Sequence, residues 1–165
     1  MIGGIINRDA VISDCGVFRY LLTRTFSIGT GICLFVLLNP SKADALIDDP
    51  SCRRCMGFAA SWGFAELWMA NAFAFRATEP KALRTAADPV GPECDAWLRK
   101  AAARADRVVI GWGGHGAYLD RDKAVLQLLH EVGVPIHHLG LTGAGQPKHP
   151  LYLRADTCPQ MWETV

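Results

Sequence analysis

The sequence lacks an excess of charge of either sign. Its 165 residues include 17 lysines and arginines against 16 aspartates and glutamates, so the formal net charge is +1 at pH 7. Affinity for nucleic acid rises with the number of phosphates that a protein neutralises, and this chain has no global positive field to supply that term. Any contact with nucleic acid is therefore expected to come from a local patch.

Long hydrophobic runs are also absent. The longest apolar run covers residues 32–38, whereas a membrane-spanning helix needs about 20 apolar residues. The first residues, MIGGIINRDAVISD, have no basic start followed by a long apolar stretch, so no secretory signal is expected. We therefore expect a cytoplasmic protein with no membrane partner, in which all six cysteines are reduced thiols.

The cysteines do not form a complete metal-binding set. Cys52 and Cys55 have the spacing of a ligand pair, but no second C-x-x-C pair is present, and zinc or iron–sulfur sites usually need four ligands. The pattern favours a helix face that carries two buried thiols. The sequence therefore predicts neither a metal site nor another cofactor.

No repeat, low-complexity tract or linker divides the chain, whose length suits one domain. Continuous apolar runs of strand length, typical of parallel strands covered on both faces, alternate with segments of helical periodicity. This alternation predicts one α/β domain over residues 1–165, with a three-layer α/β/α core at 31–153 and a four-stranded parallel sheet whose first strand is central, beside the third. The predicted strands are Cys33–Leu38, Glu66–Phe75, Arg107–Trp112 and Pro135–Leu141, and the predicted helices are Ser51–Trp62, Gly91–Ala105 and Leu119–Val132.

Residues 1–30 follow a different pattern. The segments INRDAVIS and FRYLLTRTF are rich in branched and aromatic residues, and Asp14, Cys15 and Gly16 lie between them. This pattern predicts an antiparallel N-terminal β-hairpin at the edge of the sheet. A short helix that begins near Val17 is the alternative.

Polar residues and glycines follow each predicted strand of the core. In open α/β sheets the ligand crevice lies beyond the carboxyl ends of the strands, so we expect these residues to line one cleft, with Asn39, Asn71 and His149 around it. The GWGGHG stretch lacks the G-x-G-x-x-G spacing of a dinucleotide-binding loop, and it predicts a tight turn with exposed amides. The candidate site residues are Asn39, Ser41, Asp44, Asp48, Asn71, Arg76, Trp112, Gly113, His149 and Tyr152.

Several of these residues also have a purely structural interpretation. Asn39 and Asp49 each precede a proline; Asn39 could begin a turn, and Asp49 is favoured as the N-cap of the following helix. His149 could be an ordinary loop residue. Asn71 lies within an apolar run, where its amide needs a partner because an unpaired buried amide costs about 1–3 kcal/mol.

Three segments carry a resemblance to a known superfamily. LWMANAFAFRATEP, VVIGWGGHG and KHPLYL resemble, in this order, the uracil-DNA glycosylases, in which an apolar strand carries a base-reading asparagine, a later strand ends in Trp-Gly and a His-Pro loop follows the last strand. The LLNPS segment resembles the Asn-Pro motif of the mismatch-specific branch. The whole chain also looks like an uncharacterised bacterial and phage family with the pattern RYxLxR, LNPSxAD, DDP, NLFAxRAT, AWG and HPLY.

The glycosylase resemblance implies an N-glycosidase that acts on a nucleobase, either in DNA or in a nucleoside or nucleotide. It implies that Asn39 positions water, that Asn71 bonds the base edge and that His149 stabilises charge on the departing base. Leu151–Leu153 would probe the duplex or cover the pocket. Ser41 stands where the main branch has a tyrosine, so selectivity for uracil is not implied.

Two other functions remain compatible with these residues. One is a non-catalytic nucleobase- or nucleotide-binding module that has the same pocket. The other is an enzyme that uses Asp44, Asp48 and His149 on a nucleotide-like substrate, with Mg²⁺ as a further component. The near-neutral charge and the acidic loop favour a small substrate over a long duplex.

Overall fold

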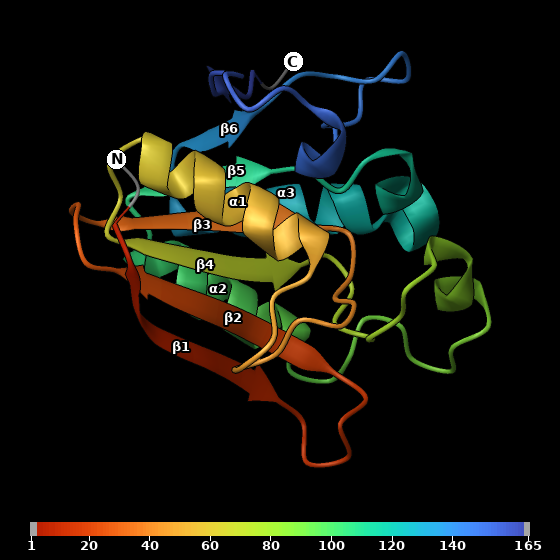
Figure 1. Cartoon of the computed structure of the whole chain (residues 1–165). Coiled ribbons are helices and arrows are strands. Elements are labelled where there is room, and N and C mark those ends of the chain that lie inside the picture. The colour runs from red at the N-terminus through yellow and green to blue at the C-terminus, as the bar shows by residue number, and fades with distance from the viewer. Residues whose placement is uncertain (1–2, 164–165) are drawn as a thin grey trace.

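The computed structural model describes residues 3–163, and it contains one seven-stranded mixed sheet and three α-helices (Figure 1). The sequence prediction of an α/β fold is confirmed; residues 1–2 and 164–165 of the predicted domain lie outside the described part. The strands are β1 (Ile5–Ile12), β2 (Arg19–Phe26), β3 (Ile32–Leu37), β4 (Glu66–Asn71), β5 (Arg107–Ile110), β6 (Ile136–His138) and β7 (Gln160–Met161). The α-helices are α1 (Pro50–Ser61), α2 (Cys94–Arg104) and α3 (Arg121–Val132), and short 3-10 helices cover Pro80–Arg84, Gly114–Asp120 and Pro150–Tyr152.

The strands lie in the order β1-β2-β4-β3-β5-β6-β7. The pairs β3–β4, β3–β5 and β5–β6 are parallel, so β3 lies between the second and third strands of the predicted core, as its apolar character indicates. The predicted hairpin joins the sheet at one edge, and β7, which the sequence did not predict, pairs antiparallel with β6 at the other. The carboxyl ends of β4, β3, β5 and β6 therefore lie at the same end of the sheet.

The N-terminal segment forms the predicted hairpin rather than the alternative helix. β1 and β2 are antiparallel, and β2 pairs antiparallel with β4 through contacts such as Leu22 with Met69. Most of β2 is buried, including Leu22 and Arg24, both fully inaccessible to solvent. The hairpin is therefore part of the central layer, and it brings a buried arginine into the core.

Helices cover both faces of the sheet (Figure 1). Alternate side chains of β3 divide between the two faces: Phe35 packs with α1 on one side, and Val36 packs with α2 and α3 on the other. Cys52 and Cys55 lie on the buried stripe of α1, as their helical spacing predicts. No helix within residues 3–163 is long and apolar enough to cross a membrane.

Several element boundaries differ from the predicted ones. β4 and β5 end earlier than their apolar runs, at Asn71 and Ile110, because the chain there leaves the sheet and enters loops. Helix α3 begins at Arg121 rather than Leu119, since Leu119 and Asp120 have φ values of 56° and 54°. Both residues occupy the left-handed region, which interrupts a helix, so Leu119 is exposed instead of lying on the apolar stripe.

Candidate functional site

A cleft of about 670 Å³ lies beyond the carboxyl ends of the parallel strands. Its volume is within the range of small-molecule sites in proteins. The loops after β3, β4, β5 and β6 and the first residues of α1 form its walls. The lining residues that bear on the chemistry are Asn39, Ser41, Asp49, Ser51, Thr78, Trp112, Gly113, His115, Thr142, Lys148, His149 and Tyr152.

The side-chain amide of Asn39 is fixed in one orientation. Its Nδ2 donates to the carbonyl oxygens of Pro40, at 3.1 Å, and of Ala77, at 2.8 Å. Both bonds need the amino group, so the two loops determine which end of the amide carries the oxygen. The Oδ1 atom makes no hydrogen bond to the described part of the chain, and it remains an acceptor for a water or a ligand. Asn39 thus takes part in the Asn-Pro turn and also keeps its Oδ1 as an acceptor for another group.

The imidazole of His149 is fixed by its own loop. Nδ1 accepts a hydrogen bond of 3.2 Å from the backbone N–H of Leu151, which places the proton of the neutral ring on Nε2. Burial lowers the pKa of His149 below its ordinary value of 6.5, and the opposing effect of Asp49 raises it only in part. His149 is therefore a neutral hydrogen-bond donor at pH 7 in the wall of the cleft.

Trp112 connects two loops in the wall of the cleft. Its Nε1 donates to Oε1 of Gln146 at 2.8 Å, and Nε2 of Gln146 donates to Asp122 at 2.9 Å. Gly116 is required here because a Cβ atom at this position would collide with the Trp112 ring. Sequence reasoning missed Gln146, which fixes the loop that carries His149 to the loop after β5.

Asn71 and Arg76 lie outside the set of residues that line the cleft. Asn71 ends β4 at the same edge of the sheet, but its side chain is buried and its Oδ1 atom has no hydrogen-bond partner in the described part of the chain. Arg76 is turned toward the hairpin, where its NH1 atom donates to the carbonyl of Gly16 at 3.4 Å. The structure thus brings together Asn39 and His149, while Asn71 is buried and does not line the cleft.

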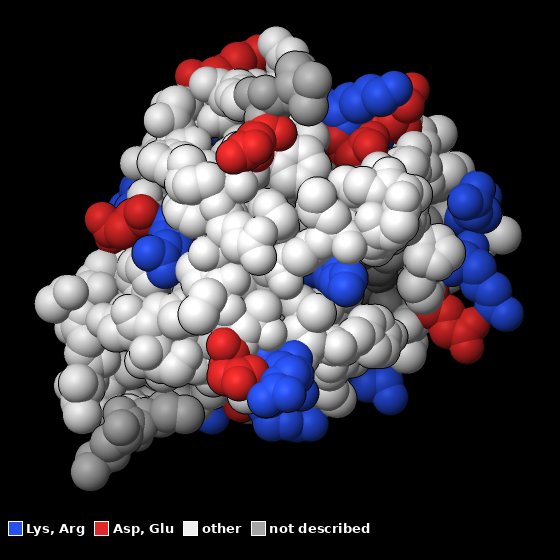
Figure 2. Space-filling model, turned by 90° about the horizontal axis from the view of Figure 1, so that it is seen from above, with Lys and Arg blue, Asp and Glu red and all other residues white. Residues whose placement is uncertain are grey.

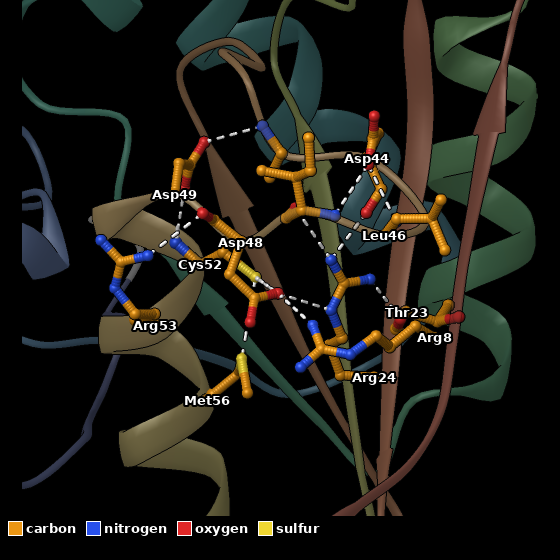
Figure 3. Close-up of polar contacts among 12 residues, drawn as sticks. Arg8, Thr23, Arg24, Asp44, Leu46, Asp48, Asp49, Cys52, Arg53 and Met56 are labelled. Carbon is orange, nitrogen blue, oxygen red and sulfur yellow. Dashed lines mark hydrogen bonds and ion pairs between the residues drawn. The ribbon is translucent and has the colours of Figure 1, made fainter.

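Asp44 and Asp48 are engaged in the loop itself and do not line the cleft (Figure 3). Oδ1 of Asp44 accepts the backbone N–H groups of Leu46 and Ile47, each at 2.8 Å, and these bonds lower the pKa of Asp44. Burial raises the pKa of Asp48, but hydrogen bonds from Arg8 and Arg24 hold it below its ordinary value. Both carboxylates therefore fix the shape of the loop.

Arg24 is the centre of this loop's polar contacts (Figure 3). Its Nε donates to Asp48 at 2.9 Å, and its NH2 atom donates to the carbonyl oxygens of Asp44 and Ile47 at 2.6 and 3.2 Å. A third nitrogen, NH1, donates to the carbonyl of Thr23 at 2.9 Å. The sequence gives no signal for this role, because Arg24 stands in an ordinary strand pattern far from the loop that it binds.

Asp49 lines the cleft and also caps α1. Its Oδ1 accepts the backbone N–H of Cys52 at 2.8 Å, which is the N-cap that the sequence favours, and its Oδ2 accepts the N–H of Ala43 at 3.2 Å. Sequence reasoning assigned Asp49 only to the cap. Its position in the wall of the cleft could be found only from the fold.

The thiols divide into two accessible and four buried groups. Cys15 and Cys158 are exposed, and Cys33, Cys52, Cys55 and Cys94 are buried. Burial raises the pKa of Cys52 to about 12 and that of Cys55 well above its ordinary value, so these thiols remain protonated at pH 7. No group of three or more metal-ligating side chains occurs within residues 3–163.

We predict that a thiol reagent such as DTNB titrates two cysteines rapidly in the native protein and all six after unfolding. Cys15 should react first, because a hydrogen bond from Ser13 lowers the pKa of its exposed thiol. Cys15→Ser should remove one of the two fast equivalents. Rapid reaction of Cys52 or Cys55 would contradict the packing of α1 described above.

In the view of Figure 2, acidic and basic side chains are interspersed among large uncharged areas.

At the mouth of the cleft, Tyr152 is 83 % exposed on its 3-10 turn, with its ring 5.9 Å from that of His149. An exposed aromatic ring beside a polar cleft suits the stacking of a planar ligand.

The comparison with protein families identifies the chain. Residues 19–151 match the family described as protein of unknown function (DUF1643). The chain belongs to this family. The matched segment begins at β2 and ends at Leu151, so it includes most of the residues that line the cleft and leaves out Tyr152 and Leu153. No curated protein and no solved structure matches the chain.

Proposed function

We propose that this DUF1643 protein is an N-glycosidase that hydrolyses the bond between a nucleobase and its sugar. One observation carries the proposal: Asn39, whose Oδ1 has no partner in the described part of the chain, and His149, whose neutral ring carries its proton on Nε2, line a single cleft. The first is an acceptor that can hold a water molecule. The second is a donor that can stabilise a base as it becomes anionic.

The chemistry follows from the placement of these two groups. As the C1′–N bond breaks, its electron pair moves to the base, and His149 donates a hydrogen bond to the developing anion. Water held by Asn39 then forms a bond to the oxocarbenium-like C1′. Tyr152 is available to stack on the base, and its exposure leaves the mouth of the cleft open to the rest of the substrate.

The motif resemblance to uracil-DNA glycosylases supports the same assignment for Asn39 and His149. It does not extend to Asn71, because Asn71 does not line the cleft. Other groups would therefore bond the edge of a base here. Ser41, Ser51 and Thr78 are among the lining side chains with hydrogen-bonding capacity, whereas both backbone groups of Gly113 bond within the chain. A substrate with one nucleobase, free or flipped out of DNA, suits the volume of about 670 Å³.

The alternative that relies on Asp44 and Asp48 is less well supported. Both carboxylates are bound by groups of the chain itself, and neither lines the cleft. The remaining alternative is a module that binds a nucleobase in the same cleft and does not cleave the glycosidic bond. A test of the proposal must therefore measure bond cleavage.

We expect the purified protein to release free base from one class in a panel of modified-base oligonucleotides, nucleosides and nucleotides. Mass spectrometry of the low-molecular-weight fraction identifies the base directly. Binding should be followed in parallel by NMR shifts of the Tyr152 and His149 rings. Ring shifts without release of base would make the protein a binding module, and neither shifts nor release with any substrate would refute the assignment of the cleft.

A further inference from the structure

We propose that Asp49 is a catalytic residue of this cleft, supplying the negative charge that stabilises the oxocarbenium-like sugar and accepting the proton of the attacking water. This inference rests on the proposed N-glycosidase function. It adds a group that the reaction needs and that Asn39 cannot provide, because a neutral amide neither carries charge nor takes up a proton.

Asp49 is the one carboxylate among the residues that line the cleft, within the described part of the chain. It lies at the start of α1 and lines the same cleft as Asn39 and His149. Its charge reaches the imidazole, since Asp49 opposes the effect of burial on the pKa of His149. The Asp49 carboxylate and the His149 imidazole thus line one cleft whose volume suits a small substrate.

The carboxylate is held in place without using all of its acceptor capacity. Each oxygen accepts one backbone N–H, from Cys52 at 2.8 Å and from Ala43 at 3.2 Å. A carboxylate has about four lone-pair positions, so two remain for substrate and water. A charge fixed by backbone groups needs no reorganisation when the cation forms, which is the condition under which electrostatic stabilisation contributes most.

A buried arginine binds the same backbone residue as this carboxylate. Arg19 is 2 % exposed, its NH1 atom donates to the carbonyl of Ala43 at 2.8 Å, and its Nε has no partner in the described part of the chain. Burial lowers the pKa of Arg19 to about 10, and Asp49 opposes this shift. The backbone of Ala43 thus links the two groups, since its carbonyl oxygen accepts from Arg19 and its N–H donates to Asp49.

The step balances with water as the only co-reactant. The C1′–N bond breaks and its electron pair leaves with the base, while the Asp49 carboxylate faces the resulting positive charge. The water oxygen forms the C1′–O bond, and one of its protons passes to Asp49 and then to solvent. The base anion, bonded to His149, takes up a proton from solvent and leaves as the neutral base.

Asp49→Asn tests the role of the charge, because asparagine also caps helices. We expect the single-turnover rate of base release to fall about 10- to 100-fold, the effect of removing one partly screened charge near the reacting carbon. The pKa of His149, followed by NMR, should fall further below 6.5. The matched control is Asp44→Asn, since Asp44 binds two backbone N–H groups of the same loop but does not line the cleft.

Asp49→Gly provides a second variant that keeps the helix start and opens space for a small anion, because glycine is a tolerated N-cap. Added formate should restore part of its rate, whereas equal chloride should not. If wild-type protein releases base and Asp49→Asn releases it equally fast, Asp49 is only a cap and this inference is wrong. If wild-type protein releases no base from any substrate, the proposed function itself is wrong.

Discussion

His149→Ala is expected to slow the release of base in a single turnover by about 10²–10³-fold, the effect of losing one preorganised donor to a developing anion. The reason lies in differential binding. His149 Nε2–H meets a weak acceptor in the intact substrate and a strong one in the departing base, so its loss raises the barrier more than it weakens binding. The rate must be measured with saturating protein, so that binding does not contribute.

The matched control is His130→Ala. His130 is an exposed histidine in the last turn of α3, remote from the cleft lining, and its replacement should leave the rate unchanged. Thermal melting should show both variants folded. An unchanged single-turnover rate in His149→Ala would reduce this residue to a cap of its own turn, since its Nδ1 accepts the Leu151 N–H.

Arg24→Ala is expected to destabilise the protein by about 3–5 kcal/mol, the usual cost of removing one partner of a buried charge pair. The guanidinium is fully buried, and its loss leaves the carbonyl oxygen of Asp44 without its arginine donor and that of Ile47 with the Asp44 N–H alone. It also leaves Asp48 with Arg8 as its one arginine partner in the described part of the chain. Chemical denaturation followed by circular dichroism measures the change in the free energy of unfolding.

Two further variants make the interpretation of this loss specific. Arg24→Lys keeps the positive charge but cannot reproduce the planar fork that contacts several acceptors, so it should lie between wild type and Arg24→Ala. Arg154→Ala removes an exposed arginine paired with Asp156, and it should change stability little. Equal stability of Arg24→Ala and wild type would show that the loop after β3 is not held from β2.

The sequence predicted the layers of this fold well because its signals are local. Continuous apolar runs such as Cys33–Leu38 mark strands buried on both faces, and the helical spacing of Cys52 and Cys55 marks the inner face of α1. Two apolar segments around Gly16 were enough to indicate the hairpin. Boundaries were less certain, as Leu119 shows, because tertiary contacts decide where a helix starts.

The site was harder to predict because its residues meet only in three dimensions. Asn39 and His149 line the cleft, whereas Asn71, at the end of β4, is buried and does not line it. The face on which a strand's last side chain points depends on register, and the apolar run around Asn71 contains no clue to it. Asp49 shows the converse, since a strong N-cap signal hid a position in the cleft wall.

The most direct test of the account is the fate of oxygen when the protein acts in H₂¹⁸O. With a substrate from which wild-type protein releases base, we expect free base without the label and a sugar product that carries one ¹⁸O at C1′. The label must be measured before the free sugar exchanges its anomeric oxygen with solvent, with unlabelled sugar product incubated in H₂¹⁸O as the control. Label in excess of that control shows that water attacks C1′ as the glycosidic bond breaks. Label in a phosphate, or label in the base itself, would place the attack at another atom and contradict an N-glycosidase in this cleft.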